Sequence, residues 1–360
     1  MNAPAPAADQ RADDAGERIV APPALAQWTA GVLAALGLSA VDAELVADTL
    51  VQADLRGVHS HGVQRMPGYV QQLQAGTIVA DAQPEVVHRT VSTAVLDAHR
   101  AMGQVAAHAA MRLALESAAE VGQGAVAIRN STHCGALAYF AMMAPPAGCI
   151  GFAATNAGMN MLPWGGQVKM VGNNPLAYAV PTGRGFPLVL DMATSVVAGG
   201  KLDVAILRGE AIPVGWALGP DGQPATDPAV ARAGSLLPIG GPKGYGLAVV
   251  LDILSGVLAG GRFGGRLGAA GSSHFVQALR IDAFTPATEF LERMGALVDQ
   301  IHDCPRAPGV DRIYLPGEIE HELSARRQQE GIPLPTTLTN ELTALSDTLG
   351  VAPLPTAPQA

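Results

Sequence analysis

The sequence predicts a mixed α/β fold, with helical segments toward both ends of the chain and a central domain built on a large sheet. The chain has 360 residues, of which 49% are apolar and 15% charged, which is enough for about two domains with a large buried core. Helical patterns dominate the first third of the chain and its end, whereas short apolar strands alternate with turns rich in Gly, Asn and Pro from about residue 124. Few gaps between those strands can hold a helix, so we expect the sheet to be antiparallel or mixed.

The N-terminal elements are predicted from capping residues and apolar spacing. Residues 1–20 are polar and rich in Ala, Pro and acidic residues, so we expect a disordered tail. Pro22 suits the first turn of a helix, and Ser39, with Asp42 three residues later, caps a second one. The expected helices run over residues 22–37, 40–56, 69–75 and 103–121, with strand structure over 85–97 and a turn-like junction over 58–67.

The central part of the chain is predicted to be mainly strands and the C-terminal part mainly helices. The expected strands are AVAIRN, IGFAATN, LAYAVP and FPLVLDM, with a late strand in SHFVQALRIDAF. Residues 244–259 are strongly apolar and predict a buried helix. Pro286 starts a helix that runs to about Cys304, and the chain from about residue 320 is helical and polar. We expect this last part to pack back on the N-terminal helices.

Composition and charge exclude several classes of protein. The net charge of −9 and the isoelectric point of about 5.4 argue against a nucleic-acid-binding protein, which needs a basic face. The cysteines, Cys134, Cys149 and Cys304, are odd in number and lack CxxC spacing, so a disulfide framework is not expected and a reducing cytoplasm fits. We find neither a signal-peptide pattern at the N-terminus nor a segment apolar enough to span a membrane.

Common nucleotide and nucleophile motifs are absent. GQGAVA at residues 122–127 matches a dinucleotide-binding glycine pattern by letter, but it follows a helix and leads into a strand, which is the reverse order. Gly200-Lys201 is followed by Leu202, so it does not complete a phosphate-binding loop. No serine-nucleophile signature is present.

The segment SHGVQR at residues 60–65 is the first candidate for chemistry. His61 and Arg65 are four residues apart, so one helical turn would put both side chains on one face. Pro67 prevents a long helix, which leaves a junction whose polar groups can face a cleft. A guanidinium suits a substrate carboxylate, and an imidazole can exchange a proton with a carbinol or carbonyl oxygen. The structural alternative is a salt bridge at a helix end beside a surface histidine.

The segment NSTHCG at residues 130–135 is the second candidate. His133 lies in a polar loop at the C-terminal end of a predicted strand, where catalytic groups are common. A histidine that only bonds the loop backbone is equally compatible with the sequence. We expect the neighbouring Cys134 to be a small packing residue.

Three further segments are candidates for anion or cofactor contacts. GNNP predicts a turn that is mainly structural, although amides such as that of Asn174 could contact a cofactor. In segment 190–195, a strand ends at Asp191 and meets a Thr-Ser helix start, which would accept a phosphate or act only as a helix cap. Segment 240–246, GGPKGYG, adds the charge of Lys243 to a glycine-rich helix start and is the best phosphate-contact candidate.

A metal site is the alternative reading of the histidines. His59 and His61 could ligate zinc together with His133, as in a metal-dependent hydrolase or lyase. No acidic residue stands at a convincing fourth position.

Taken together and in order, these motifs resemble the type-2 malate/L-lactate dehydrogenase family, which includes sulfolactate and ureidoglycolate dehydrogenases, diketogulonate reductase and Δ1-piperideine-2-carboxylate reductase. The resemblance covers about residues 22–335. It rests on RGVHSHGVQRMPGYV, NSTHCG, GNNPLAYAVP, VLDMATSVVAGGK, GPKGYGLAVVLDILSGVLAGG and YLPGEIE.

The family resemblance implies NAD- or NADP-dependent hydride transfer at a small 2-hydroxy or 2-oxo acid, or at a cyclic imino acid. It also implies a cofactor domain with a large, mainly antiparallel sheet that is not a Rossmann fold, which agrees with the rejected glycine pattern. Members are typically homodimers with the active site near the subunit interface. On this basis we expect a disordered tail at 1–20, an N-terminal helical and substrate domain at 21–122, a cofactor-binding sheet domain at 123–285 and a C-terminal helical part at 286–350.

Site residues follow from the matching motifs. The resemblance implies that Ser60, His61 and Arg65 hold the substrate, with His61 and His133 as the two acid/base candidates. The cofactor contacts that it implies are Asp191, Met192, Ala193, Thr194, Ser195, Lys243, Gly244, Asn174 and, in YLPGEIE, Gly317 and Glu318. It implies no metal, and it leaves open the choice between NAD and NADP and the identity of the substrate.

The sequence departs from the family pattern at the presumed pocket. Cys134 stands where relatives usually carry an aromatic residue, residues 137–140 replace a Gly-Tyr-Tyr-like ending, and Pro145 and Pro146 interrupt a helix that relatives usually continue. These differences bear on the substrate more than on the type of reaction.

Overall fold

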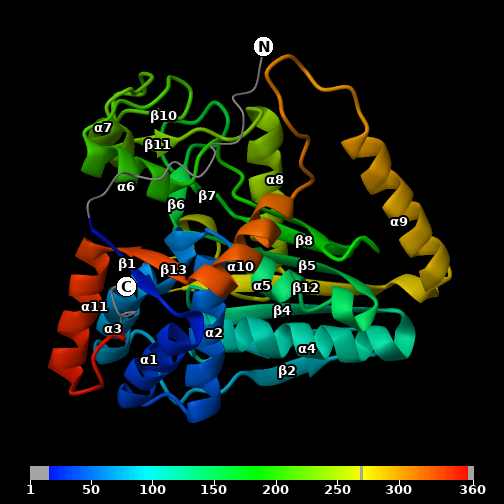
Figure 1. Ribbon diagram of the computed structural model, residues 1–360, viewed down its shortest axis with the longest axis horizontal. Helices are drawn as coiled ribbons and strands as arrows, with labels where there is room; N and C mark the ends of the chain where they lie inside the picture. The colour runs from blue at the N-terminus through cyan, green and yellow to red at the C-terminus, as the bar shows by residue number, and fades with distance from the viewer. Residues whose placement is uncertain (1–15, 268–270, 356–360) are drawn as a thin grey trace. The chain divides into compact units, whose positions relative to one another are not determined.

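The computed structural model describes residues 16–267 and 271–355 (Figure 1). Contacts divide the chain into two compact units. The first, here called the terminal unit, contains the described residues up to Gln74, Thr182–Leu188 and those from Ala287 onward. The second, the sheet unit, contains Ala75–Pro181 and Val189–Pro286. Both ends of the chain therefore contribute to one unit.

The terminal unit is mainly helical. Its helices and turns are α1 (Pro22–Ala35), α2 (Ala40–Leu55), η1 (His59–His61), η2 (Val63–Arg65), α3 (Met66–Gln74), α9 (Ala287–His302), α10 (Glu318–Glu330) and α11 (Thr336–Leu349). The Ser39 hydroxyl accepts a hydrogen bond from the Asp42 amide at 3.1 Å, which confirms the predicted cap of α2. The buried Trp28 indole of α1 donates to the Ser346 hydroxyl of α11 at 2.9 Å, so the first and last helices pack together.

A short strand pair also joins the two ends of the chain. Strand β1 (Glu17–Val20) pairs antiparallel with β13 (Ile332–Pro335). The predicted disordered tail is therefore wrong for these four residues, because pairing with a distant strand satisfies their backbone groups. The predicted tail over residues 1–15 lies outside the described residues.

The sheet unit is built on a seven-stranded mixed sheet in the order β2-β3-β4-β12-β5-β8-β9. β3 and β4 are parallel, whereas β2–β3, β4–β12, β12–β5 and β5–β8 are antiparallel. The strands are β2 (Glu85–Arg89), β3 (Thr93–Asp97), β4 (Gln123–Ser131), β5 (Cys149–Thr155), β8 (Leu176–Pro181), β9 (Pro187–Met192) and β12 (Ser272–Arg280). A mixed sheet is what the scarcity of helix-length gaps predicts.

Helices α4 (Gly103–Val121) and α5 (Leu137–Ala141) pack on this sheet through small side chains, and Figure 1 shows α4 running beside β4. Gly122 ends α4 with a φ of 88°. A Cβ on Gly124 would lie 2.0 Å from the Ala114 carbonyl oxygen. The glycines of GQGAVA therefore serve the turn and the close packing of α4 on β4.

A smaller four-stranded sheet completes the unit in the order β10-β11-β6-β7. Its elements are β6 (Met159–Met161), β7 (Val171–Gly172), β10 (Ala217–Leu218), β11 (Ser235–Leu236), α6 (Gly199–Arg208) and α7 (Pro228–Ala233). Helix α8 (Pro242–Asp252) continues into a π-helical turn, η4 (Ile253–Val257). The prediction of a fully buried helix here is wrong for one face, where Leu247, Val250, Ile253 and Val257 are exposed.

Remaining short turns are η3 (Pro145–Ala147), η5 (Gly264–Arg266) and η6 (Ile281–Ala283). Among the described residues, none of the helices has the length and hydropathy that a transmembrane span requires.

Candidate active site

The SHGVQR segment folds as two short 3-10 turns between α2 and α3. Amide-to-carbonyl hydrogen bonds close the turns at His61 to Val58 (2.9 Å) and at Arg65 to Gly62 (3.0 Å). Helix α2 ends at Leu55, and Gly57 then takes a φ of 76°, which favours glycine. The predicted junction is therefore confirmed up to Arg65, but α3 starts at Met66 instead of residue 69, because Pro67 fits the first turn of a helix.

Ser60, His61 and Arg65 lie together on this junction. The Ser60 hydroxyl is 2.9 Å from Nδ1 of His61, and Nε of Arg65 donates to the Ser60 carbonyl oxygen. Burial, helped by the positive charge of Arg65, lowers the pKa of His61 to about 4. His61 is therefore neutral at physiological pH and can accept a proton beside a fixed positive charge.

The junction rests on a buried carboxylate in α2. Asp54 is 1% exposed, and its two oxygens accept from different residues of the junction. Oδ1 lies 2.8 Å from Nδ1 of His59, and Oδ2 accepts from the Val63 amide at 2.8 Å. A Cβ on Gly62 would lie 2.0 Å from Oδ1 of Asp54, so only glycine fits against this carboxylate.

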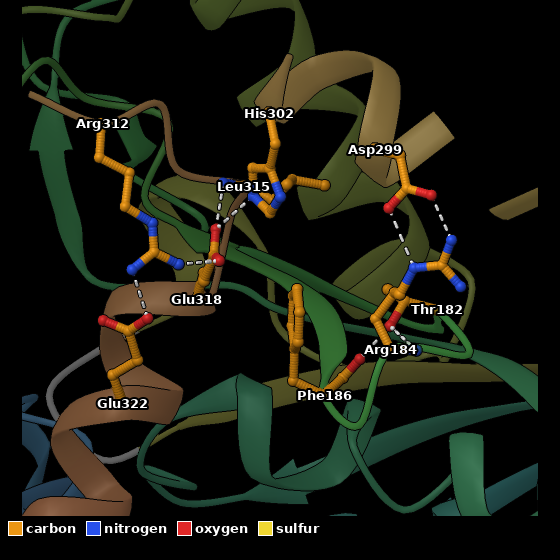
Figure 2. Close-up of polar contacts among 9 residues, drawn as sticks. All are labelled: Thr182, Arg184, Phe186, Asp299, His302, Arg312, Leu315, Glu318 and Glu322. Atoms are coloured by element: carbon orange, nitrogen blue, oxygen red, sulfur yellow. Dashed lines mark hydrogen bonds and ion pairs between the residues drawn. The ribbon is translucent and has the colours of Figure 1, made fainter. Parts of the chain in front are cut away.

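In the YLPGEIE segment, Gly317 is the residue before α10 and Glu318 is its first residue. The Glu318 carboxylate is buried and accepts from Nε2 of His302 at 3.1 Å, from the Leu315 amide at 3.0 Å and from Arg312. Burial raises the pKa of Glu318, but these donors outweigh it, and the net pKa lies below the usual value. Figure 2 shows the carboxylate directed at His302 and Arg312, so in this structure Glu318 ties the start of α10 to the end of α9 and to the loop between them.

The NSTHCG segment forms the end of β4 and the loop before α5. The Thr132 hydroxyl accepts from the Gly103 amide at 2.9 Å and donates to the Ala101 carbonyl at 3.0 Å, which fixes the loop to the start of α4. Nδ1 of His133 accepts from the Gly135 amide at 3.3 Å. The proton of a neutral His133 therefore lies on Nε2.

Cys134 is buried, and burial together with the nearby charge of Asp191 raises the pKa of its thiol to about 12. A thiol protonated under all physiological conditions is a poor nucleophile, which supports the packing interpretation.

Asp191 joins the end of β9 to the His133 loop. Its Oδ2 accepts from the Ala138 amide at 2.8 Å, within the first turn of α5. Because α5 has no side-chain cap of its own, a carboxylate from another strand supplies this function. The structure thus brings the second and fourth candidate segments together.

The third and fifth segments also reach this region of the sheet unit. The Thr194 amide donates to the Asn173 carbonyl at 3.0 Å, and the Ile239 amide donates to the Thr194 carbonyl at 2.9 Å. Asn174 is fully buried, accepts from the Ala157 amide and donates to the Ala248 carbonyl, both at 2.8 Å. Its side-chain amide therefore links the residues after β5 to α8, and the predicted cofactor contact at Asn174 stays a prediction.

Several groups here fit an anionic cofactor. The Thr194 Oγ1 atom is buried without a hydrogen-bond partner among the described residues. Helix α8 starts after Gly241, which has a φ of 64° and offers no side-chain cap. Lys243 is exposed in its first turn and forms no ion pair with the residues that the structure describes. Free amides, an unpaired ammonium and an unused hydroxyl suit a phosphate-bearing ligand.

The other predicted cofactor contacts in the sheet unit are Met192, Ala193, Ser195 and Gly244. Met192 and Ala193 are partly exposed at the end of β9. The Ser195 hydroxyl donates to the Val197 carbonyl at 2.7 Å. A Cβ on Gly244 would lie 2.2 Å from the Ile239 carbonyl oxygen, so this glycine allows α8 to approach the preceding loop. Their predicted contacts with a cofactor stay predictions.

The alternative metal site at His59, His61 and His133 is not supported. Nδ1 of His59 bonds Asp54, and its Nε2 lies 3.0 Å from Nη1 of Arg327, so both ring nitrogens are already bonded and a guanidinium stands where a cation would. Over residues 16–267 and 271–355, the structure contains no group of three or more His, Cys, Asp or Glu side chains suited to a metal.

Comparison with known proteins shows to which family the chain belongs. The family model for malate/L-lactate dehydrogenase matches residues 20–343. The chain belongs to the malate/L-lactate dehydrogenase family. It is 40% identical over 333 residues to the malate dehydrogenase of Pyrococcus abyssi, which covers 89% of this chain and 92% of that one.

Other members differ in substrate and cofactor. The NAD(+) ureidoglycolate dehydrogenase of Escherichia coli K12 is 35% identical, over 83% of this chain and 87% of its own. The (2R)-3-sulfolactate dehydrogenase (NADP(+)) of Chromohalobacter salexigens is 36% identical, over 87% and 93%. The crystal structure of malate dehydrogenase from Entamoeba histolytica matches with a TM-score of 0.90 and 31% identity, covering 93% of this chain and 99% of that one. These dehydrogenases support an oxidoreductase with a mixed α/β fold.

Sequence reasoning missed two groups in this member of the malate/L-lactate dehydrogenase family. His274 of β12 is fully buried, with Nδ1 2.7 Å from the Thr155 hydroxyl and Nε2 2.9 Å from the Ser131 hydroxyl. Burial lowers the pKa of His274 to about 4. Arg327 of α10 is buried against Asp54 and His59. No local motif marks either residue, because their partners are more than a hundred positions away in the chain.

Proposed function

We propose that this protein is an NAD- or NADP-dependent dehydrogenase that acts on a small 2-hydroxy or 2-oxo acid of the malate and lactate type, or on a cyclic imino acid. The observation that carries the proposal is the position of His61 beside Arg65 on one short junction, where burial and the charge of Arg65 lower the pKa of His61. A proton acceptor and a carboxylate receptor at this spacing suit a 2-hydroxy acid. Family membership gives the reaction class.

In the proposed mechanism, Arg65 binds the substrate carboxylate through its guanidinium, and Ser60 helps to hold the substrate. During oxidation, His61 or His133 takes the proton of the substrate hydroxyl, and during reduction the same residue returns it. The other histidine orients the substrate. Most of the rate would come from positioning and from the positive charge near the developing oxyanion.

A nicotinamide cofactor, when bound, would supply the hydride acceptor or donor for the reaction. Lys243 and the first amides of α8 would hold its phosphates, which the lack of a carboxylate partner for Lys243 among the described residues supports. Asp191 keeps the His133 loop in place, and Thr194 offers an unused buried hydroxyl. We assign Met192, Ala193, Ser195, Gly244, Asn174, Gly317 and Glu318 to the surroundings of the cofactor.

We assign the cofactor to the sheet unit, whose mainly antiparallel strand pairs differ from the parallel order of a Rossmann fold. Of the expected N-terminal part, 21–122, the described residues up to Gln74 group with the C-terminal helices, and this terminal unit would carry the substrate junction. We also propose a cytoplasmic homodimer. The exposed apolar face of α8 and η4, formed by Leu247, Val250, Ile253 and Val257, supports a second copy as the partner.

A panel of 2-oxo acids and cyclic imines against NADH and NADPH, followed at the nicotinamide absorbance, tests the proposal. We expect turnover of at least one substrate of the panel with NADH, NADPH or both. A pure, folded protein that oxidises neither cofactor with any member of the panel would contradict it. Sedimentation analysis would separately test the dimer.

A further inference from the structure

A buried three-residue network lies at the base of the SHGVQR junction, entirely within the terminal unit. Arg327, from α10, is only 6% exposed, although it carries a permanent charge. Its Nη1 atom donates to the Asp54 backbone carbonyl and lies 3.0 Å from Nε2 of His59. The other ring nitrogen of His59 lies 2.8 Å from the Asp54 carboxylate.

The network fixes the tautomer of His59. A guanidinium has donors and no acceptor, so Nε2 of His59 must accept the hydrogen bond from Arg327. Nδ1 of the neutral ring then carries the proton and donates to the Asp54 carboxylate. Each hydrogen on Nη1 of Arg327 has an acceptor, and the positive and negative charges of Arg327 and Asp54 lie on opposite sides of one imidazole.

The same network holds the segment that carries His61 from both sides. The Asp54 carboxylate binds His59, two residues before His61, and the Val63 amide, two residues after it. A movement of this carboxylate would therefore shift both ends of a five-residue segment. Arg65, which directly follows in η2, moves with the Val63 end.

Helix α10 makes a second contact with the junction. A Cβ on Gly57 would lie 2.6 Å from Cδ2 of Leu323, and 3.9 Å from Nη1 of Arg327. The left-handed Gly57 thus allows α10 to pack against the turn that leads into η1. Helix α10 therefore packs against the residue that leads into the junction.

We propose that Asp54, His59 and Arg327 are positioning residues, which set the direction of the His61 imidazole and the Arg65 guanidinium toward the substrate. This inference rests on the proposed function, because it assigns His61 and Arg65 to the substrate. The three residues touch neither substrate nor cofactor in this proposal. They act by keeping one direction of hydrogen bonding, in which Arg327 donates to His59 and His59 donates to Asp54.

Two substitutions at residue 59 test this direction of hydrogen bonding. The amide of His59→Gln has one donor and one acceptor, as the neutral imidazole does, whereas His59→Phe has neither. We expect His59→Phe to lower kcat/KM for the carboxylate substrate by about 10–100-fold, since small misplacements of reacting groups have effects of this size. We expect His59→Gln to restore most of the loss. KM for the nicotinamide cofactor should remain within about twofold in both variants.

Arg327→Met, with the neighbouring Arg326→Met as its matched control, tests the other end of the network. We expect kcat to fall and the substrate KM to rise in Arg327→Met but not in Arg326→Met. A cooperative unfolding transition in both variants would show that both are folded. Equal activity of His59→Gln and His59→Phe, or an equal effect of the two arginine variants, would overturn the positioning role.

Nitrogen-15 NMR of histidine-labelled wild-type protein provides a readout that needs no turnover. We expect His59 to show a protonated Nδ1 and an unprotonated Nε2, and Arg327→Met to give a mixture of tautomers. A protonated Nε2 in the wild type would overturn the network. Inactivity of the wild type with every substrate would instead contradict the proposed function, while the NMR result would still stand.

Discussion

The carboxylate of Asp191, at the end of β9, accepts a hydrogen bond at 2.8 Å from the Ala138 amide in the first turn of α5. The two residues are 53 positions apart in the chain, and their contact ties the His133 loop to the predicted cofactor segment. A single exposed carboxylate thereby holds the fourth candidate segment against the second.

Asp191→Ala should therefore loosen the His133 loop. Caps of this kind are worth about 1 kcal/mol, so we expect Asp191→Ala to lower the free energy of unfolding by roughly that amount. Asp191→Asn keeps an acceptor oxygen and should lose less. Urea unfolding monitored by circular dichroism measures both, and equal losses in the two variants would contradict the hydrogen-bond explanation.

Lys243→Met should weaken cofactor binding without changing substrate recognition. The ammonium group is exposed in the first turn of α8, where the helix dipole already favours an anion. We expect the Kd for NADH or NADPH to rise by about 10–100-fold, the size of one charge-assisted hydrogen bond. Cofactor fluorescence titration measures this change. Lys169→Met is the control, because Lys169 bonds only the Ala233 carbonyl in the described structure, and a similar effect there would refute the assignment.

Arg65→Met should affect both substrate binding and the pKa of His61. Loss of a carboxylate receptor of this kind costs about 2–5 kcal/mol, so kcat/KM should fall by roughly 30-fold or more. Because the charge of Arg65 helps to lower the pKa of His61, that pKa should rise from about 4 toward its ordinary value. NMR titration of His61 in the variant tests the second effect, and an unchanged titration curve would mean that burial alone sets the pKa.

His274 should make the protein sensitive to mild acid. Its folded pKa of about 4 lies below the value of 6.5 for an unfolded histidine, because the buried ring disfavours the charged form. Between pH 6.5 and 4 the unfolded state therefore binds more protons than the folded state. The contribution of His274 to stability is complete above pH 6.5 and is lost as the pH falls toward 4. The expected loss is roughly 3 kcal/mol.

Chemical unfolding at several pH values measures this slope. His274→Gln should flatten the pH dependence between 6.5 and 4, whereas His88→Gln, at an exposed position of β2, should not. A slope that is the same in the wild type and in His274→Gln would show that other groups cause the acid sensitivity.

Local chemistry allowed much of the fold to be predicted. The helix over residues 103–121 is found with those bounds, because its apolar spacing and the following glycine are both local signals. The helix start at Pro22 and the cap at Ser39 are found for the same reason. The β1–β13 pair was missed because its register depends on residues more than 300 positions apart, a relationship that a single sequence does not contain.

The candidate site shows the same division. Cys134 was correctly expected to pack. The segments that contain Asn174, Asp191 and Lys243 are linked within the sheet unit by backbone and side-chain hydrogen bonds. Residues that act by supporting others were not found. Arg327 lies in a polar helix with no distinctive motif, and only the folded chain shows that it is buried beside His59.

The exposed face of α8 could not be predicted from the sequence either. A continuous apolar run correctly predicts a helix here, but the prediction that the helix is fully buried is wrong, because the run does not say whether a neighbouring element or another chain covers each face. Leu247 and Val250 are exposed in the single chain, so the composition of this helix is consistent with the proposed dimer.

The central claim is that His61 and His133 act on the same substrate, and a double-mutant cycle tests it most directly. We expect His61→Ala and His133→Ala each to lower kcat/KM by about 10²–10⁴-fold, as loss of an acid, a base or an orienting group does. The double variant should be much less impaired than the product of the two effects, because residues that act as a unit are not additive. Near-normal turnover in both single variants, or losses that multiply in the double variant, would contradict the account.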